Sequence, residues 1–197
     1  MATATTKNKV KFRLKCAYYA PITESEADGI ITDTYGTPIR LRGAVSTNLS
    51  PSGELTKLYA DAMLYYVGNG NNGYSGNLDF ALLDDDFRSY ALGERIDGTT
   101  GLLVETSSDE PKPFALLFEF EGDKKAIRHV MYKCYASRPS IEGENGETKE
   151  PKAESITITA VPREKDNMVK TKTTATTPAE TYNAFYSKVC EPSEVAE

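Results

Sequence analysis

The chain has 197 residues, 39% of them hydrophobic, and a formal net charge of −6. This length allows one domain that buries roughly 70% of the surface exposed by its unfolded form, and no apolar run approaches the roughly 20 residues of a membrane-spanning helix. The acidic balance argues against a DNA- or RNA-binding protein, because such affinity comes largely from lysine and arginine.

Residues 1–8 are expected to form a polar N-terminal arm. The opening stretch MATATTKNK has threonines where a signal peptide would carry an apolar segment, so the sequence predicts synthesis in the cytoplasm. The three cysteines, Cys16, Cys134 and Cys190, lack a C-x-x-C spacing. This favours reduced, buried thiols over a zinc site or a disulfide framework.

The first predicted strand covers residues 10–18 and ends before Pro21. Its apolar residues alternate with basic ones, which places Phe12 and Leu14 in the core and leaves a basic outer face. Residues 22–38 contain glycines and acidic residues and are interpreted as a loop. Residues 39–49 alternate weakly, as a strand interrupted by Gly43.

Residues 36–76 are predicted to contain a long loop or hairpin. Between residues 53 and 76 the apolar residues fit neither the helical nor the strand period, and a stretch rich in glycine and asparagine follows at 68–73. That stretch matches G-x-G-x-x-G, but residues 74–80 are predicted to form a strand, whereas a dinucleotide site would need a helix there. A mobile loop is therefore favoured, and loops of this length are usually functional.

A short helix is predicted after the strand at residues 77–83. The three aspartates at 84–86 supply an N-cap and an acidic first turn, Phe87, Tyr90 and Ala91 form an apolar stripe, and Gly93 ends the helix. The alternating ligands of a calcium loop are missing around these aspartates, so capping is favoured over cation binding.

Residues 113–135 are the clearest hairpin in the sequence. Four large residues of its first strand alternate with smaller ones, and Gly122-Asp123 is predicted to be a two-residue turn. This turn would place Phe118 opposite Ile127 and Leu116 opposite His129. The single histidine would then lie inside the apolar face, which favours a structural role over a catalytic one.

The C-terminal part is predicted to contain one strand and one helix. After an acidic loop at 142–154, Ile156 and Ile158 alternate with polar residues, and a threonine-rich run follows at 170–177. Thr177 and Glu180 are spaced as a capping box before a helix, which presents the apolar stripe Tyr182, Phe185, Tyr186 and Val189. Residues 191–197 are expected to be a frayed tail.

These elements predict a mainly β protein: a single domain over residues 1–197, built as a β-sandwich or barrel with a short flanking α-helix, the long loop or hairpin, and a C-terminal helix. No nucleophile and base are placed together and no metal or cofactor site is evident, so the sequence does not predict an enzyme. The expected core residues are Phe12, Leu14, Phe114, Leu116, Phe118, Phe120, Ile127, Ile156 and Ile158.

Several short sequence motifs occur in a specific order between residues 7 and 159. They are TYGTP at 34–38, YAD at 59–61 with Tyr65 and Tyr66, NNGYSG at 71–76, DFR at 86–88, LGE at 92–94, PKPFALLFEF at 111–120, RHV at 128–130 and RPS at 138–140. In this order and spacing the chain resembles the major tail tube proteins of long-tailed, siphovirus-type bacteriophages that infect Gram-positive bacteria.

The resemblance implies a structural virion protein without catalytic residues. Its copies would form hexameric rings that stack into a hollow tail tube, together with tape-measure, tail-tip and tail-terminator proteins, and genomic DNA would pass through without specific binding. The long hairpin would touch the next ring, and an acidic lumen would repel phosphate. The contact residues expected on this basis are Tyr59, Asp61, Tyr65, Tyr66, Asn72 and Tyr74, and the lumen residues are Glu119, Glu121 and Asp123.

A second hypothesis is a monomeric carbohydrate- or protein-binding β-sandwich. The 12 tyrosines could form its binding face. A mass measurement separates the two hypotheses, because a tube subunit must assemble with increasing concentration. A hydrolase is a more distant third, because the nucleophile–base pair is missing.

Overall fold

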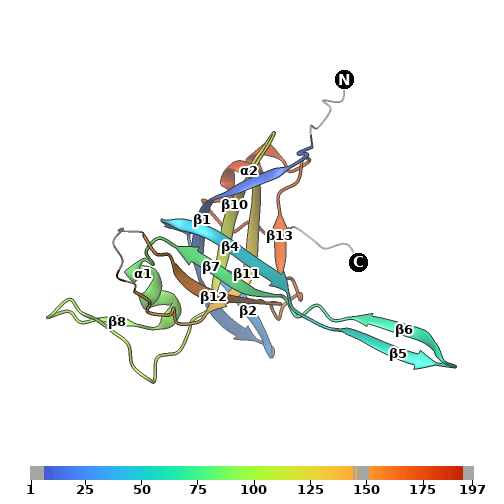
Figure 1. The fold of residues 1–197 in the computed structure, drawn as a ribbon, viewed down its shortest axis with the longest axis horizontal. Helices are drawn as coiled ribbons and strands as arrows, with labels where there is room; N and C mark the ends of the chain where they lie inside the picture. Colours follow the sequence, from blue (N-terminus) through green and yellow to red (C-terminus); the bar gives the residue numbers. More distant parts are fainter. Residues whose placement is uncertain (1–6, 144, 146–150, 193–197) are drawn as a thin grey trace.

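The computed structural model describes residues 7–143, 145 and 151–192. The protein is mainly β, as predicted, and is dominated by one large antiparallel sheet (Figure 1). Within the described residues the strands of this sheet follow the order β2-β1-β10-β11-β12-β7-β4, with β3 beside β1 and β13 beside β11. Their bounds are β1 Lys11–Ala27, β2 Ile30–Tyr35, β3 Ile39–Leu41, β4 Ala44–Pro51, β7 Tyr74–Phe80, β10 Phe114–Gly122, β11 Ile127–Ala136, β12 Glu154–Val161 and β13 Lys170–Lys172.

The sheet curls back on itself through β3 and β4, which are separated by two residues. Leu41 in β3 pairs with Ala17 in β1, whereas Ala44 in β4 pairs with Phe80 in β7. The carbonyl of Gly43 between them accepts a hydrogen bond from Ala81 N at 2.8 Å. Because β4, at one end of the strand order, is joined directly to β3, which pairs with β1 near the other end, the sheet forms a barrel-like wall around its core.

The main core lies inside this wall. Phe114, Leu116 and Phe118 of β10 are buried there with Ile156 and Ile158 of β12, as the alternation predicts. One end is covered by α1 (Asp85–Phe87) and the π-helical turn η1 (Arg88–Leu92).

The predicted signals of this short helix are confirmed. The side chain of Asp84 accepts a hydrogen bond from Asp86 N at 2.9 Å, and Gly93 ends the helix with a φ of 81°. Phe87 is fully buried and makes edge-to-face contacts with Tyr19 and Phe114. The helix therefore closes the barrel end through aromatic packing.

A second apolar layer covers the outer face of β10 and β11. Leu117, Val130 and Tyr132 pack there against Phe185 and Val189, which follow the short helix α2 (Ala179–Ala184). The predicted apolar stripe thus packs on the sheet. The predicted capping box is wrong, because the hydroxyl of Thr177 accepts from Thr174 N at 2.8 Å and no side chain caps the helix.

The first strand is longer than predicted. β1 continues through Pro21 to Ala27 and pairs with β2, so the predicted loop at 22–38 is mostly a second hairpin. Pro21 is the last residue of β1 that pairs with β10, and Ile22 is the first that pairs with β2. Because Pro21 lies at this change of partner strand, its missing N–H does not end β1. Asp28 and Gly29 turn this hairpin with φ values of 54° and 76°.

The central hairpin differs from the prediction by two residues in register. Phe118 lies opposite His129, and Leu116 lies opposite Met131. The turn is longer because Asn8 fills it: its side-chain oxygen accepts from the backbone N of Lys124 and Lys125 at 3.0 and 2.9 Å. A slip of two residues keeps each side chain on its face, so the apolar face was assigned correctly.

Phe12 is not a core residue, contrary to the prediction. Its side chain is 57% exposed, because register shifts in β1 between Lys11 and Cys16 break the alternation. Leu14 and Phe120 are half-buried against the main core, and Ile127 is also half-buried. The remaining strands are two small hairpins outside the sheet: β5 (Leu55–Ala60) with β6 (Met63–Asn69), and β8 (Arg95–Ile96) with β9 (Leu103–Val104).

The predicted tail and acidic loop lie partly outside the described residues. The residues outside the description are 1–6 of the predicted N-terminal arm, 144 and 146–150 of the acidic loop, and 193–197 of the tail. Glu154, assigned to the loop, instead begins β12, and β13 forms within the threonine-rich run.

Candidate assembly surfaces

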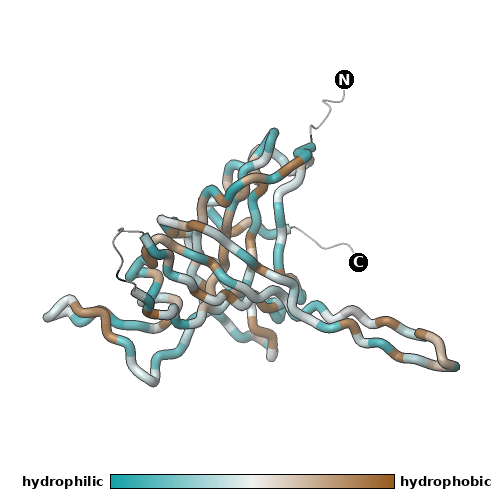
Figure 2. The backbone as a smooth tube through the Cα atoms, viewed as in Figure 1, coloured by the Kyte–Doolittle hydropathy of each residue, from teal (hydrophilic) through white to brown (hydrophobic). Residues whose placement is uncertain are grey.

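The most exposed apolar surface described is a two-stranded arm, β5 and β6, that projects from the barrel (Figure 1). Hydrophobic residues occur along both of its strands (Figure 2). Its large apolar side chains are between 48% and 76% exposed: Leu55, Leu58, Tyr59, Met63, Leu64, Tyr65, Tyr66 and Val67. An uncovered apolar surface of this kind usually marks a site of protein interaction.

Both faces of the arm are apolar. Tyr59 pairs with Leu64 on one face and Leu58 pairs with Tyr66 on the other, with a bulge between them. Since paired residues point to the same side of a hairpin, neither face is the polar one. This explains why the apolar residues fit no single period. Within the predicted loop or hairpin at residues 36–76, residues 55–69 form a hairpin.

The arm joins the barrel through a narrow neck. Ser52 N donates to the carbonyl of Gly73 at 2.9 Å, and Asn72 N donates to the carbonyl of Ser52 at 2.9 Å. At Gly53, whose φ is +130°, a Cβ atom would lie 2.0 Å from the carbonyl oxygen of Gly70. Glycine is thus required at position 53, where the two segments that form the neck approach closely.

The predicted contact residues lie in three places. Tyr59, Asp61, Tyr65 and Tyr66 lie together on the arm, and Asp61 is at its tip. Asn72 lies instead in the neck. Tyr74 belongs to β7, where it is half-buried against the main core with the ammonium of Lys170 4.0 Å from its ring centroid.

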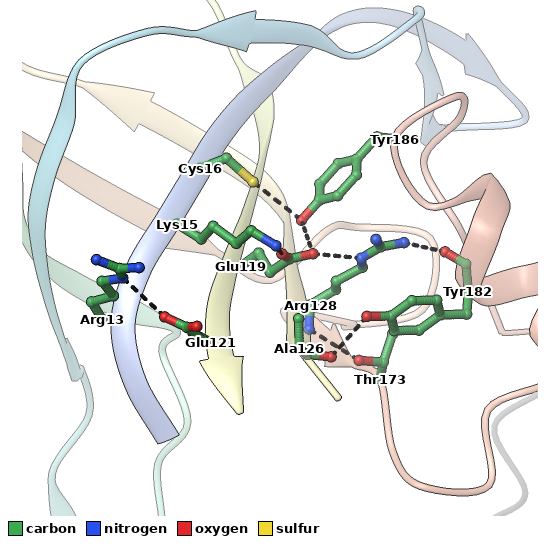
Figure 3. Close-up of polar contacts among 10 residues, drawn as sticks. All are labelled: Arg13, Lys15, Cys16, Glu119, Glu121, Ala126, Arg128, Thr173, Tyr182 and Tyr186. Atoms are coloured by element: carbon green, nitrogen blue, oxygen red, sulfur yellow. Dashed lines mark hydrogen bonds and ion pairs between the residues drawn. The ribbon is translucent and has the colours of Figure 1, made fainter. Parts of the chain in front are cut away.

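Glu119 cannot line a lumen as predicted, because its side chain is buried beneath the C-terminal segment. Its carboxylate accepts hydrogen bonds from Arg128 Nε at 2.7 Å and Tyr186 OH at 3.2 Å, and it lies 3.3 Å from Lys15 Nζ (Figure 3). The sequence did not predict this network, because its members are up to 171 positions apart and meet only after β1, β10, β11 and the segment after α2 pack together.

Arg128 is the centre of this network. Its guanidinium lies 3.9 Å from the ring centroid of Tyr182 and 4.7 Å from that of Tyr186, and it donates to the carbonyl of Tyr182. Burial lowers the pKa of Arg128, but the hydrogen bond and charge of Glu119 together with the nearby hydroxyls of Tyr182 and Tyr186 outweigh it, so the pKa is raised overall. Burial also raises the pKa of Tyr186, which keeps its hydroxyl protonated. The network therefore fixes the C-terminal segment to the barrel.

A second arginine holds the end of the same segment. Arg163 is buried, donates to both carboxylate oxygens of Asp166 at 2.7 Å and to Tyr35 OH at 3.1 Å, and pairs with Glu191. Its guanidinium lies 4.5 Å from the ring centroid of Tyr132. The two arginines together fasten residues 179–191 across the outer face of the sheet.

The other two predicted lumen residues lie at the turn between β10 and β11. Glu121 accepts from Arg13 Nε at 2.9 Å. Asp123 accepts from Lys9 N at 2.8 Å, and this backbone hydrogen bond lowers the pKa of its carboxyl. Each is therefore paired within its own chain at a largely basic end of the molecule.

His129 lies in the apolar face, where its ring stacks on Phe118 with centroids 5.1 Å apart and meets Phe120 edge to face at 5.6 Å. Burial lowers the pKa of His129 to about 4, and the charges of Lys172, Lys170 and Lys11 act in the same direction. These contacts describe a packed aromatic residue rather than half of a nucleophile–base pair.

One cleft of about 360 Å³ contains carboxylates. It is lined by Glu94, Glu105, Asp109 and Arg138, among others, between the end of η1 and the start of the loop after β11. Glu94 is buried, and its Oε1 lies 3.6 Å from Arg88 Nη1. Burial raises the pKa of the Glu94 carboxyl. Glu105 pairs with Arg138 at 2.6 Å. The acidic groups therefore already have cationic partners.

Among the described residues, no group of three or more His, Cys, Asp or Glu side chains could hold a metal ion. None of the helices in the same part of the chain is both long and apolar enough to cross a membrane. Neither the models of known protein families nor the curated proteins include a match to this chain. The surfaces described above are therefore the basis for a functional proposal.

Proposed function

We propose that this protein is the major tail tube subunit of a long-tailed bacteriophage that infects Gram-positive bacteria. Copies form hexameric rings, and the rings stack into the tube of the virion through which DNA reaches the host. The observation that carries the proposal is the β5–β6 arm: a hairpin with apolar side chains on both faces that the described residues of the subunit leave exposed. A subunit that must bind its neighbours needs such a surface, because large exposed apolar patches mark sites of interaction.

The remaining architecture suits a structural role. The barrel has a packed core rich in aromatic residues. The half-buried Arg128 and the buried Arg163 fasten its C-terminal segment, while the arm extends away from this body. The stretches that resemble tail tube proteins include residues 59–61 at the arm tip, 71–76 at its neck and 111–120 in and before β10. The resemblance thus includes both the arm and the body.

The partners follow from the tube. Its lumen holds a tape-measure protein during assembly and later passes the genome, while tail-tip and terminator proteins bind its two ends. The net charge of −6 is consistent with a wall that DNA passes without specific binding.

The test removes the arm and leaves the barrel. Because Gly70 N already donates to the carbonyl of Glu54 at 3.3 Å, deletion of 55–69 lets Glu54 and Gly70 close a short turn. We expect the deleted protein to melt at the same temperature as the wild type and to stay monomeric by light scattering. The wild type should form tubes in electron micrographs as its concentration rises.

A point variant with a matched control refines this test. Tyr65→Ser removes the most exposed large side chain of the arm, at 76% exposure, while Ile141→Ser removes an apolar side chain that is 99% exposed elsewhere. Only Tyr65→Ser should impair assembly. Wild-type protein that remains monomeric at millimolar concentration contradicts the proposal.

The second candidate is a monomeric carbohydrate- or protein-binding domain. The exposed tyrosines Tyr59, Tyr65 and Tyr66 favour it, because aromatic rings stack on sugars and anchor protein ligands. In that case the arm deletion abolishes ligand binding, and the molar mass does not depend on concentration.

A further inference from the structure

The two ends of β1 carry opposite charge. The strand begins among exposed cations, Lys9, Lys11, Arg13 and Lys15, and it ends in a hairpin tip with the exposed carboxylates of Glu26 and Asp28. Its 17 residues have a contour length of roughly 55 Å. In Figure 1 the start of β1 lies at one extremity of the barrel, near α2, and the β1–β2 hairpin lies at the opposite one.

The basic end is hollowed. A groove of about 490 Å³ lies between the N-terminal segment, the β10–β11 turn and the residues after β13. Lys7, Lys125 and Lys172 line it together with apolar groups that include Ile127 and Ala175. Lys125 also lies over the ring of Tyr182, at 3.6 Å from the centroid, which positions its charge at the groove.

The acidic end is convex and matches the groove in chemistry. Glu26 pairs with Ile31 across the hairpin and Ala27 pairs with Ile30, and Ile30 is 50% exposed. The tip thus presents carboxylates beside an apolar side chain. At the base of the hairpin Lys133 binds Glu24 and Asp33, whereas Glu26 and Asp28 form no ion pair with any described residue.

We infer that the β1–β2 hairpin tip of one copy inserts into the basic groove of a second copy. The carboxylates of Glu26 and Asp28 would face the ammonium groups of Lys125 and Lys172, and Ile30 would meet the apolar floor. Because the two surfaces lie at opposite ends of one subunit, the contact is heterologous and repeats along an open stack. This inference rests on the proposed function, since it identifies a contact between successive subunits that is separate from the arm.

The contact is small and electrostatic. A hairpin tip buries far less than the roughly 1,600 Å² of a standard interface, so a single contact is weak and a stack depends on many of them. Its charges are at the surface, where about 0.5 M salt reduces the screening length to a few ångströms. Association should therefore weaken strongly as salt rises.

The test is a charge exchange. At 50 mM NaCl, Glu26→Lys alone and Lys172→Glu alone should each raise the dissociation constant for self-association at least about tenfold, measured by sedimentation velocity. The chain that carries both substitutions should recover most of the loss, because the reversed pair attracts again. Lys188→Glu, the same charge change at an exposed site outside the groove, is the matched control. Thermal melting establishes that every variant is folded.

The outcomes separate this inference from the tube proposal. If Glu26→Lys forms tubes as readily as the wild type, the hairpin–groove contact is refuted and the tube proposal stands. If the wild type forms no tubes but its salt-sensitive association is lost and restored as described, the contact stands and the tube proposal falls. If Lys172→Glu reduces binding of a short DNA duplex while Glu26→Lys does not change self-association, the groove is a polyanion site and the inference is wrong.

Discussion

Two antiparallel hairpins, β10–β11 and β5–β6, differ in what covers them. The β10–β11 hairpin is covered on both faces, by the main core on one side and by the C-terminal segment on the other. The β5–β6 hairpin is apolar on both faces, and the part of the chain that the structure describes covers neither face. Each is paired along its length with one register shift, so backbone pairing alone does not account for the difference.

The difference lies in where the stabilising free energy comes from. A two-stranded hairpin alone is marginally stable in water, and burial of its side chains is what fixes it. β10 and β11 receive that burial within their own chain. The arm receives little burial from the described residues of its own chain. Under the proposed function a second subunit would supply that burial, and the order of the arm would then depend on assembly.

Loss of a core side chain should show the largest effect. Phe118→Ala removes a ring that is 4% exposed and stacked on His129, so we expect the free energy of unfolding to fall by about 3–5 kcal/mol. Tyr65→Ala in the arm should change it by less than about 0.5 kcal/mol in the monomer. Urea melts of dilute protein measure both values. Equal losses would mean that the arm is packed against the barrel.

The buried ion pair should show the second largest effect. Arg128→Leu leaves the carboxylate of Glu119 buried without its hydrogen-bonded cation, which should cost about 3 kcal/mol. The C-terminal segment should loosen first, because Arg128 also contacts Tyr182 and Tyr186. Limited proteolysis near residues 179–190 detects this. A variant that loses less than about 1 kcal/mol and remains resistant to protease would show that apolar packing alone holds the segment.

The elements that the sequence predicted correctly are those whose burial is local and regular. Phe114, Leu116, Phe118, Ile156 and Ile158 alternate without interruption, and each is buried as predicted. The α1 cap is also local, since Asp84 and Gly93 act on residues beside them. The faces of such a strand can be predicted from sequence, because its large side chains recur at every second position.

The failures have non-local causes. The register of β10 and β11 depends on Asn8, which enters the turn from more than 100 residues away. Phe12 is exposed because of bulges that the alternation does not reveal. The apolar residues of the arm showed no regular period because both of its faces are apolar. The burial of Glu119 was not predicted because its partners, Lys15, Arg128 and Tyr186, come from three other segments of the chain.

Acid should weaken the covered hairpin through His129. Its pKa is about 4 in the folded protein, against about 6.5 in the unfolded chain. Between these values the unfolded chain binds a proton that the folded protein does not, so stability is complete above pH 6.5 and falls as the pH drops toward 4. Allowing for partial exposure, we expect a loss of about 1–2 kcal/mol at pH 5.

The matched variant is His129→Phe, which keeps a ring stacked on Phe118 and removes the titrating group. The difference in unfolding free energy between variant and wild type should grow as the pH falls from 6.5 to 4. A constant difference over that range would show that other groups cause the acid sensitivity.

The smallest expected effect concerns the turn of the uncovered hairpin. The arm turns through Asp61 and Ala62 with φ values of 53° and 62°, whereas the β1–β2 hairpin turns through Asp28 and Gly29 with nearly the same backbone. An alanine in this left-handed region is strained by roughly 1 kcal/mol, and a glycine is not. Ala62→Gly should therefore stabilise the arm by about 0.5–1 kcal/mol without changing the melting temperature of the barrel, which the arm does not cover.

Hydrogen exchange of the monomer measures this local effect. Amides in β5 and β6 should exchange about twofold to fivefold more slowly in the Ala62→Gly variant, while those of β7 remain unchanged. A more ordered arm also loses less conformational freedom on binding, so assembly should begin at a modestly lower protein concentration. Slower exchange without easier assembly would mean that the arm must rearrange when it meets its partner, and unchanged exchange would mean that the turn does not limit the order of the arm.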